Sequence, residues 1–162
     1  MQEVFILSVI GICGCNTETA TKLRAALKNT VGNEAGLRYV EDGGIYDAIF
    51  IGKPPRNQNE FKTDILIIPD TVDTSRLSPI LANFVVSYGM NRENTVTASS
   101  INGEKLSVSV RRRIPTVIGG FVDEQEIIIH SKKGSATDEI LGEVATLLAA
   151  GAEPKSLSEI SF

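Results

Sequence analysis

The run Cys13-Gly14-Cys15-Asn16-Thr17-Glu18-Thr19 carries the strongest chemical signal in the chain, because it follows an apolar segment and precedes a helical pattern. A strand that enters a Gly-containing turn and then a helix directs backbone N–H groups and the positive helix end toward an anion. The candidate nucleotide- or phosphate-binding residues are therefore Gly14, Cys15, Asn16, Thr17, Glu18 and Thr19. The alternative is a tight turn in which the glycine serves only close packing.

The lysine that a working phosphate-binding loop places before its hydroxyl residue is missing, and Glu18 occupies that position. That lysine normally supplies positive charge to the terminal phosphates. A carboxylate about 4 Å from a phosphate costs about 4 kcal/mol at an effective dielectric constant of about 20. We therefore expect tight ATP binding in the usual pose to be unfavourable unless Glu18 turns away.

Asp70 is a further candidate, because it directly follows the apolar run Ile65-Leu66-Ile67-Ile68-Pro69. Nucleotide enzymes often keep an acid on the magnesium side at the end of such a strand. The alternative is an aspartate that caps the following turn, which Pro69-Asp70-Thr71 suits.

Cys13 and Cys15 are candidate reactive thiols, because a helix N-terminus stabilises a thiolate. With Thr17, Thr19 and Thr21, Cys13-Gly14 resembles the phosphocysteine loop of phosphotransferase-system IIB components, which implies cysteine-dependent phosphotransfer. Redox chemistry is a related hypothesis, and burial as small core residues is the alternative. The single histidine, His130, is interpreted as structural, so we assign no catalytic residue and no metal ligand.

Composition indicates one soluble globular domain spanning residues 1–162, with 42% apolar residues, 22% charged residues and a net charge of −4. The negative charge argues against nucleic acid or an anionic membrane as a partner, and Arg111-Arg112-Arg113 is interpreted as a solvated strand end. No apolar stretch approaches the roughly 20 residues of a membrane span. We expect no secretory signal and a reducing, cytoplasmic location for the two cysteines.

The periodicity predicts an α/β protein with a three-layer, P-loop or Rossmann-like sheet, parallel in its N-terminal half and with antiparallel hairpins in its C-terminal half. Expected strands cover Val4–Ile10, Leu37–Val40, Ile45–Ile51, Asp64–Asp70 and Asn83–Tyr88, followed by hairpins of Thr95–Ile101 with Glu104–Val110 and of Ile114–Ile118 with Glu126–His130. Expected helices run from Asn16 or Thr17 to Gly32, over one or two turns in Ser75–Leu81, and from Ala136 to Ala150 with Ser135 as the cap.

Several segments together resemble the central, ATP-binding domain of the Mur ligase and folylpolyglutamate synthase superfamily. Gly14, Asn16 and Thr19 match its I-T-G-T-N-G-K-T loop, and Asp70 matches its N-A-D-D strand end. The resemblance extends to the family's V-x-T-Y-G strand, its late β segment and its last helix, through Phe84–Gly89, Thr95–Ile101 and Leu147–Gly151. It implies a nucleotide-binding fold and ATP or ADP with magnesium as possible ligands.

The departures from that family determine the functional hypothesis. Thr17 and Glu18 replace the loop's second Gly and its Lys, Ile68 stands where an adenine-side Asn is expected, and Gly134–Ile140 lacks the G-x-H-N-x-x-N motif. The leading hypothesis is a degenerate, non-catalytic binding or scaffolding module with a protein partner or a second copy of itself. The alternatives are an atypical nucleotide- or phosphate-binding protein and a cysteine-dependent phosphotransfer or redox protein.

Overall fold

The structure is a computed structural model that describes residues 7–41, 43–54, 60–73, 80–132 and 134–162. Its strands are β1 (Ser8–Cys13), β2 (Ala35–Tyr39), β3 (Ile45–Ile51), β4 (Phe61–Pro69), β5 (Ile80–Tyr88), β6 (Val96–Asn102), β7 (Lys105–Val110), β8 (Ile114–Pro115), β9 (Phe121–Val122) and β10 (Gln125–His130). Its helices are α1 (Thr17–Val31), the 3₁₀ turn η1 (Gly32–Glu34), α2 (Thr137–Ala149) and α3 (Pro154–Leu157). None of the helices in these ranges has the length and apolar character needed to cross a membrane.

One eight-stranded sheet organises the molecule, in the order β10-β7-β6-β5-β4-β3-β1-β2. Pairing is parallel from β2 through β1, β3, β4 and β5 to β6, and antiparallel between β6, β7 and β10. The predicted α/β class, the parallel N-terminal half and the antiparallel C-terminal half are therefore confirmed. The carboxyl ends of β1, β3, β4 and β5 meet at one edge, where open α/β sheets bind ligands.

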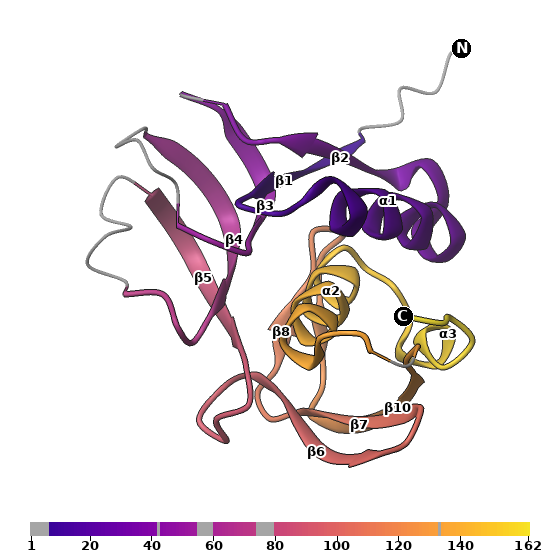
Figure 1. The fold of residues 1–162 in the computed structure, drawn as a ribbon. Coiled ribbons are helices and arrows are strands. Elements are labelled where there is room, and N and C mark those ends of the chain that lie inside the picture. The colour runs from indigo at the N-terminus through magenta and orange to yellow at the C-terminus, as the bar shows by residue number, and fades with distance from the viewer. Residues whose placement is uncertain (1–6, 42, 55–59, 74–79, 133) are drawn as a thin grey trace.

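Both long helices lie on the same face of the sheet, which curves around α2 (Figure 1). Their apolar side chains share a large core with inward-facing residues of the central strands, such as Ile10, Ile12 and Ile67. A second cluster, including Ile49 and Leu66, covers the opposite face, and none of its members belongs to a helix in the described ranges. In the described residues the helices therefore cover one face of the sheet, whereas the predicted three-layer arrangement has helices on both faces. Residues 55–59 of the β3–β4 connection and 74–79 of the β4–β5 connection lie outside the described residues.

Helix α1 forms where the sequence predicts it and for the predicted reason. The Asn16 side chain accepts a hydrogen bond from the Thr19 N–H at 2.7 Å, which caps the first turn. Leu23 and Leu27 lie on the buried face, and the helix ends at Gly32, whose φ is 65°.

Strand β1 runs through Cys13, so the predicted end at Ile10 is wrong, and residues 4–6 lie outside the described residues. The strand continues because Gly11 and Cys13 pair with Ile49 and Ile51 of β3. A side chain at Gly11 would collide with Tyr46, so glycine there serves packing inside the strand rather than a turn. Only three residues, 14–16, therefore connect β1 to α1.

Two boundaries near β4 and β5 also differ from the prediction. Strand β4 begins at Phe61, and β5 begins at Ile80, so Ile80 and Leu81 are strand residues and not part of a helical turn. Residues 75–79 of that expected turn lie outside the described residues.

The first predicted hairpin is confirmed, with its turn one residue later than expected. Asn102 pairs with Lys105, so the turn residues are Gly103 and Glu104. The second predicted hairpin is wrong, because β8 pairs with the short β9 while β10 pairs with β7. The apolar alternation of β10 could not indicate which antiparallel neighbour it would join.

The helix near the C-terminus is confirmed, but its predicted cap is wrong. Helix α2 begins at Thr137 after Ala136, which makes no side-chain capping bond. The Ser135 hydroxyl donates instead to the Phe162 carbonyl at 3.5 Å. Gly151 and Pro154 follow the end of the helix as predicted, and Pro154 begins α3, which the sequence analysis missed.

Candidate functional site

The β1–α1 turn is closed tightly against the end of β3. Gly14 has a φ of 68°, and a Cβ there would overlap the Lys53 backbone. The Gly52 N–H donates to the Cys13 carbonyl at 2.9 Å. The glycine therefore performs the packing role that the sequence analysis held open as the alternative to anion binding.

The amide groups at the start of α1 are only partly available for a ligand. The Thr19 N–H donates to the Asn16 side chain, so one of the backbone N–H groups in the first turn of α1 is no longer free to bind a ligand. Thr19 itself is buried at 7% exposure. Glu18 lies apart from this turn, because its carboxylate pairs with Lys22 one helical turn along α1 at 3.4 Å and its side chain is 77% exposed.

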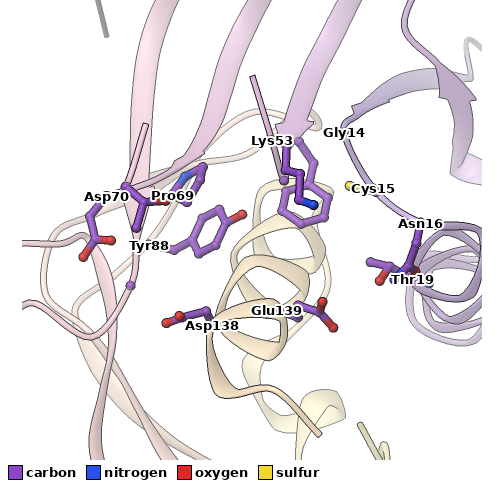
Figure 2. Close-up of a pocket in the computed structure, with 14 residues that line it drawn as sticks. Gly14, Cys15, Asn16, Thr19, Lys53, Pro69, Asp70, Tyr88, Asp138 and Glu139 are labelled. Atoms are coloured by element: carbon purple, nitrogen blue, oxygen red, sulfur yellow. Dashed lines mark hydrogen bonds between the residues drawn. The ribbon is translucent and has the colours of Figure 1, made fainter. Parts of the chain in front are cut away.

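A cavity of about 230 Å³ lies at the carboxyl ends of β1, β3, β4 and β5 and at the N-terminal ends of α1 and α2 (Figure 2). Its walls combine loop residues, strand ends and the first turn of α2: Gly14, Cys15, Asn16, Thr19, Phe50, Gly52, Lys53, Pro69, Asp70, Thr71, Tyr88, Gly89, Asp138 and Glu139. We call it the strand-end cavity. The structure thus brings Gly14, Cys15, Asn16, Thr19 and Asp70 of the predicted site together, whereas Thr17 and Glu18 are not among the lining residues.

The charges in the strand-end cavity are mostly negative. Asp70, Asp138 and Glu139 contribute carboxylates, and Lys53 contributes the one ammonium group among the lining residues. No ion pair within 4 Å joins Lys53 to a carboxylate in the described part of the chain. Because the carboxylates of Asp138 and Glu139 occupy the first turn of α2, they use the favourable positive end of that helix themselves.

Sequence analysis missed three of these four charged residues. Lys53 stands two residues beyond the apolar strand Ile45–Ile51, and the carboxyl ends of parallel strands meet at a common edge. Asp138 and Glu139 were visible only as first-turn acids of a helix, a position that acidic residues often occupy for stability alone. Nothing in the sequence indicated that this turn would face the β1–α1 turn.

Asp70 directly follows β4, as predicted, and is held in place by two contacts. Its N–H donates to the Tyr88 carbonyl at 2.9 Å, and its carboxylate accepts from the Asn94 amide at 2.8 Å. A Cβ at Gly89 would overlap this carboxylate, so a glycine is needed there for close approach. The geometry suits a positioned acid and a turn residue equally.

The two cysteines point toward opposite faces of the sheet, because Cys15 packs against the core that contains the helices and Cys13 against the opposite cluster. Burial raises the pKa of both thiols, and that of Cys15 to about 11. The Cys15 thiol donates to the Cys13 carbonyl at 3.7 Å. A raised thiol pKa disfavours the thiolate at neutral pH, which is the opposite of what a nucleophilic cysteine needs.

A second cavity, of about 360 Å³, lies between α1 and the N-terminal part of α2, and we call it the inter-helix cavity. It is lined by Asn16, Glu18, Thr19, Lys22, Lys132, Gly134, Ser135, Ala136, Glu139, Ile140, Glu143 and Phe162. Glu143 is only 5% exposed. Desolvation by burial, against a smaller opposing effect of Lys22, raises the pKa of Glu143 to about 7.

The arginine run lies at the exposed end of β7. Arg112 donates to the Glu93 carbonyl at 2.7 Å, and Arg113 pairs with Asp123 at 3.3 Å and lies over the Phe121 ring at 4.3 Å. These contacts are local, and they agree with the interpretation of a solvated strand end.

The fold defines a class, an α/β domain like those of Mur ligases, and here it carries a cavity of about 230 Å³ at the carboxyl ends of its parallel strands. Two solved structures are similar to it: the UDP-N-acetylmuramoylalanyl-D-glutamyl-2,6-diaminopimelate–D-alanyl-D-alanyl ligase of Acinetobacter baumannii and a second crystal structure, of MurF from the same organism. Each has a TM-score of 0.56 and 12% identity over 94% of this chain. The chain spans 46% and 45% of their lengths, respectively.

Sequence comparison adds nothing to this likeness. No family model matches the chain, and no curated protein matches it. At 12% identity the structural similarity shows a shared fold, and it agrees with the resemblance seen in the loop and strand motifs.

Proposed function

We propose that the protein is a non-catalytic binding module on a Mur-ligase-like fold, and that its strand-end cavity takes a small ligand other than a tightly bound nucleoside triphosphate. The observation that carries this proposal is the charge of that cavity. Three carboxylates and one ammonium line the space where the family resemblance implies anionic phosphates. Each like-charge contact at about 4 Å opposes phosphate binding by about 4 kcal/mol at an effective dielectric constant of about 20.

The residues present fit ATP with magnesium poorly. Thr19 supplies the hydroxyl that the family uses for the metal ion, and Asp70 supplies an acid at the strand end. The loop lysine is absent, and no group of three or more His, Cys, Asp or Glu side chains able to hold a metal ion is found among the described residues. The proposed role is therefore binding without ATP turnover.

Isothermal titration of the protein with ATP and with ADP, each with magnesium, tests the proposal. We expect no tight binding and no release of phosphate. A Glu18→Lys variant should not restore binding, because position 18 projects along α1 toward Lys22 rather than into the strand-end cavity. An Asp138→Asn, Glu139→Gln double variant removes two of the cavity's negative charges and should increase any residual ATP affinity.

The outcome that would overturn the proposal is micromolar ATP binding by the natural protein together with steady phosphate release. A Glu104→Gln, Glu159→Gln double variant is the matched control, because it removes two exposed carboxylates outside both cavities. An equal gain in ATP affinity in that control would show that overall charge, and not the cavity, controls binding.

An atypical phosphate-binding protein is the second candidate, and Lys53 is the observation that favours it. Its ammonium projects into the strand-end cavity beside the β1–α1 turn (Figure 2). It could supply from β3 the positive charge that the loop lacks. Measurable ADP binding that disappears in Lys53→Gln but survives in Lys62→Gln would favour this candidate over the first.

A protein partner or self-association belongs to the first proposal, as does a cytoplasmic location. Leu81 and Val85 on β5 are 63% and 57% exposed. Because they are four residues apart in a strand, their side chains point to the same face of the sheet. Exposed apolar side chains of this kind support an interaction surface. Light scattering of the natural protein and of a Leu81→Ser, Val85→Ser variant would test it, and a monomer in both cases would count against self-association.

A further inference from the structure

The Glu143 side chain is a buried carboxyl group that Lys22 stabilises only at a distance, without a hydrogen bond or ion pair in the described residues. It is 5% exposed. It lines the inter-helix cavity rather than packing against apolar atoms alone. Buried carboxyl groups are normally hydrogen-bonded or paired, so a cavity that one of them faces is a candidate site for a cationic group.

A second carboxylate lies one helical turn away. Glu139 precedes Glu143 by four residues on α2, which places the two about 6 Å apart along the helix axis. Glu139 lines both cavities, as do Asn16 and Thr19, so the inter-helix and strand-end cavities adjoin at these residues. The inter-helix cavity thus contains the buried Glu143 carboxyl and, where it adjoins the acidic strand-end cavity, the Glu139 carboxyl.

The remaining walls suit an aliphatic chain with charged ends. Ile140 and Phe162 also line the inter-helix cavity, and although each is only 4% exposed they supply apolar lining that a methylene chain can contact. Of the two ammonium groups that the described residues bring to this cavity, Lys22 is already paired with Glu18, and Lys132 has no ion pair in the described residues. The strand-end cavity beyond Glu139 adds the carboxylates of Asp138 and Asp70.

We propose that the inter-helix cavity binds a linear aliphatic diamine, with one ammonium on Glu143, the other on Glu139, and the methylene chain against Ile140 and Phe162. The rise of about 6 Å between positions 139 and 143 along α2 is of the same order as the separation of the ammonium groups in a short alkyl diamine. An isolated metal ion fits less well, because no cluster of three or more ligating side chains is found in the part of the chain that the structure describes. The inference rests on the proposed binding role of this edge, but not on whether a nucleotide binds there.

The affinity for a diamine should be higher at about pH 8 than at about pH 6, because only the ionised Glu143 carboxylate attracts an ammonium group. The groups that face Glu143 are Glu18 and Lys22 from α1, Glu139 from α2, and Lys132 at the rim of the cavity. Burial raises the pKa of Glu143 to about 7, so its carboxyl is ionised at about pH 8 and largely protonated at about pH 6. Alkyl ammonium groups stay protonated at both values, since their pKa is near that of lysine, about 10.4.

Titration calorimetry with 1,4-diaminobutane tests the inference, with butane-1,4-diol and 1-aminobutane as the uncharged and singly charged controls. We expect the diamine to bind more tightly than either control at about pH 8 and to lose at least about tenfold in affinity in Glu143→Gln. Glu139→Gln, at the junction of the cavities, should lose a similar factor, and it provides an independent test if Glu143→Gln fails to fold. Glu104→Gln, in the β6–β7 turn, should bind as the natural protein does.

Three outcomes would overturn the inference: no diamine binding at millimolar concentration and about pH 8, equal binding of the diol, or unchanged affinity in folded Glu143→Gln and Glu139→Gln. A parallel ATP titration separates this result from the proposed function. ATP binding with turnover would overturn the proposed function and leave the diamine result interpretable. Absence of both ligands would overturn only the diamine inference.

Discussion

Replacement of Glu143 by glutamine should stabilise the protein at high pH and leave its stability almost unchanged at low pH. In the folded state the pKa of Glu143 is raised from 4.5 to about 7, chiefly by burial. The folded protein therefore retains a proton over a pH range in which the unfolded chain has lost it. Glutamine has nearly the same shape and no charge to bury, so the variant lacks this titration.

The sign and size of the effect follow from proton linkage. Stability associated with a raised carboxyl pKa is fully present below the unfolded value and is lost as the pH rises from about 4.5 to about 7. Each pKa unit corresponds to about 1.4 kcal/mol, so the loss amounts to about 3 kcal/mol above pH 7. This value is an upper bound, because the side chain, although only 5% exposed, faces the inter-helix cavity.

Urea unfolding of the natural protein and of Glu143→Gln, at several values from about pH 5 to about pH 8, measures the difference directly. Other titrating groups cancel in that difference, and Glu159→Gln controls for the loss of one exposed charge. We expect the variant to gain about 2.5 kcal/mol relative to the natural protein between the ends of this range, because part of the loss has already occurred at pH 5. A difference that stays constant with pH would refute the reasoning, as would a variant that is less stable than the natural protein at pH 8.

Further predictions concern the β1–α1 turn. Gly14→Ala should lower the free energy of unfolding in urea by at least about 3 kcal/mol, because residue 14 has a positive φ and an added Cβ would overlap the Lys53 backbone. Gly103 also has a positive φ but has open space around it, so Gly103→Ala should lower the free energy of unfolding by only about 1 kcal/mol. Asn16→Ala should cost about 1 kcal/mol through loss of the α1 cap, and Asn16→Ser should recover most of it. Thiol labelling of Cys15 in the native protein at neutral pH should be slower than in the unfolded chain, because burial raises its pKa to about 11; equal rates would contradict its burial.

Local sequence signals predicted the elements whose determinants are local. Asn16 and Gly32 delimit α1, the alternation and apolar content of Ile45–Ile51 correspond to β3, and the Asn102-Gly103 pair marks a hairpin. The errors occur where the deciding contact is distant in the chain. Glycine at position 11 suggested the end of a strand, but its pairing with Ile49 of β3 keeps it inside β1.

The same distinction applies to the candidate site. The β1–α1 turn and Asp70 were predicted because each directly follows an apolar strand, and parallel strands bring such positions to one edge. Glu143 could not be predicted, because it occupies one of ten consecutive buried positions on α2, and only the placement of α1 makes its side chain line a cavity. A glutamate among apolar helix residues was a detectable irregularity, but its meaning depended on where α1 would lie.

The direction of Glu18 changes how the loss of the loop lysine should be understood. A glutamate that faced the ligand would itself prevent phosphate binding, and its reversal to lysine would restore the site. Because Glu18 pairs with Lys22 on the surface of α1, the proposed obstacle to phosphate binding is the pair Asp138 and Glu139, which belong to a different helix and line the strand-end cavity. An edge that lacked a lysine would be neutral toward ligands, whereas an edge with added carboxylates selects against anions and in favour of cations. On the proposed binding role, the charge of α2, rather than the residue at position 18, therefore decides which ligands the strand-end cavity accepts.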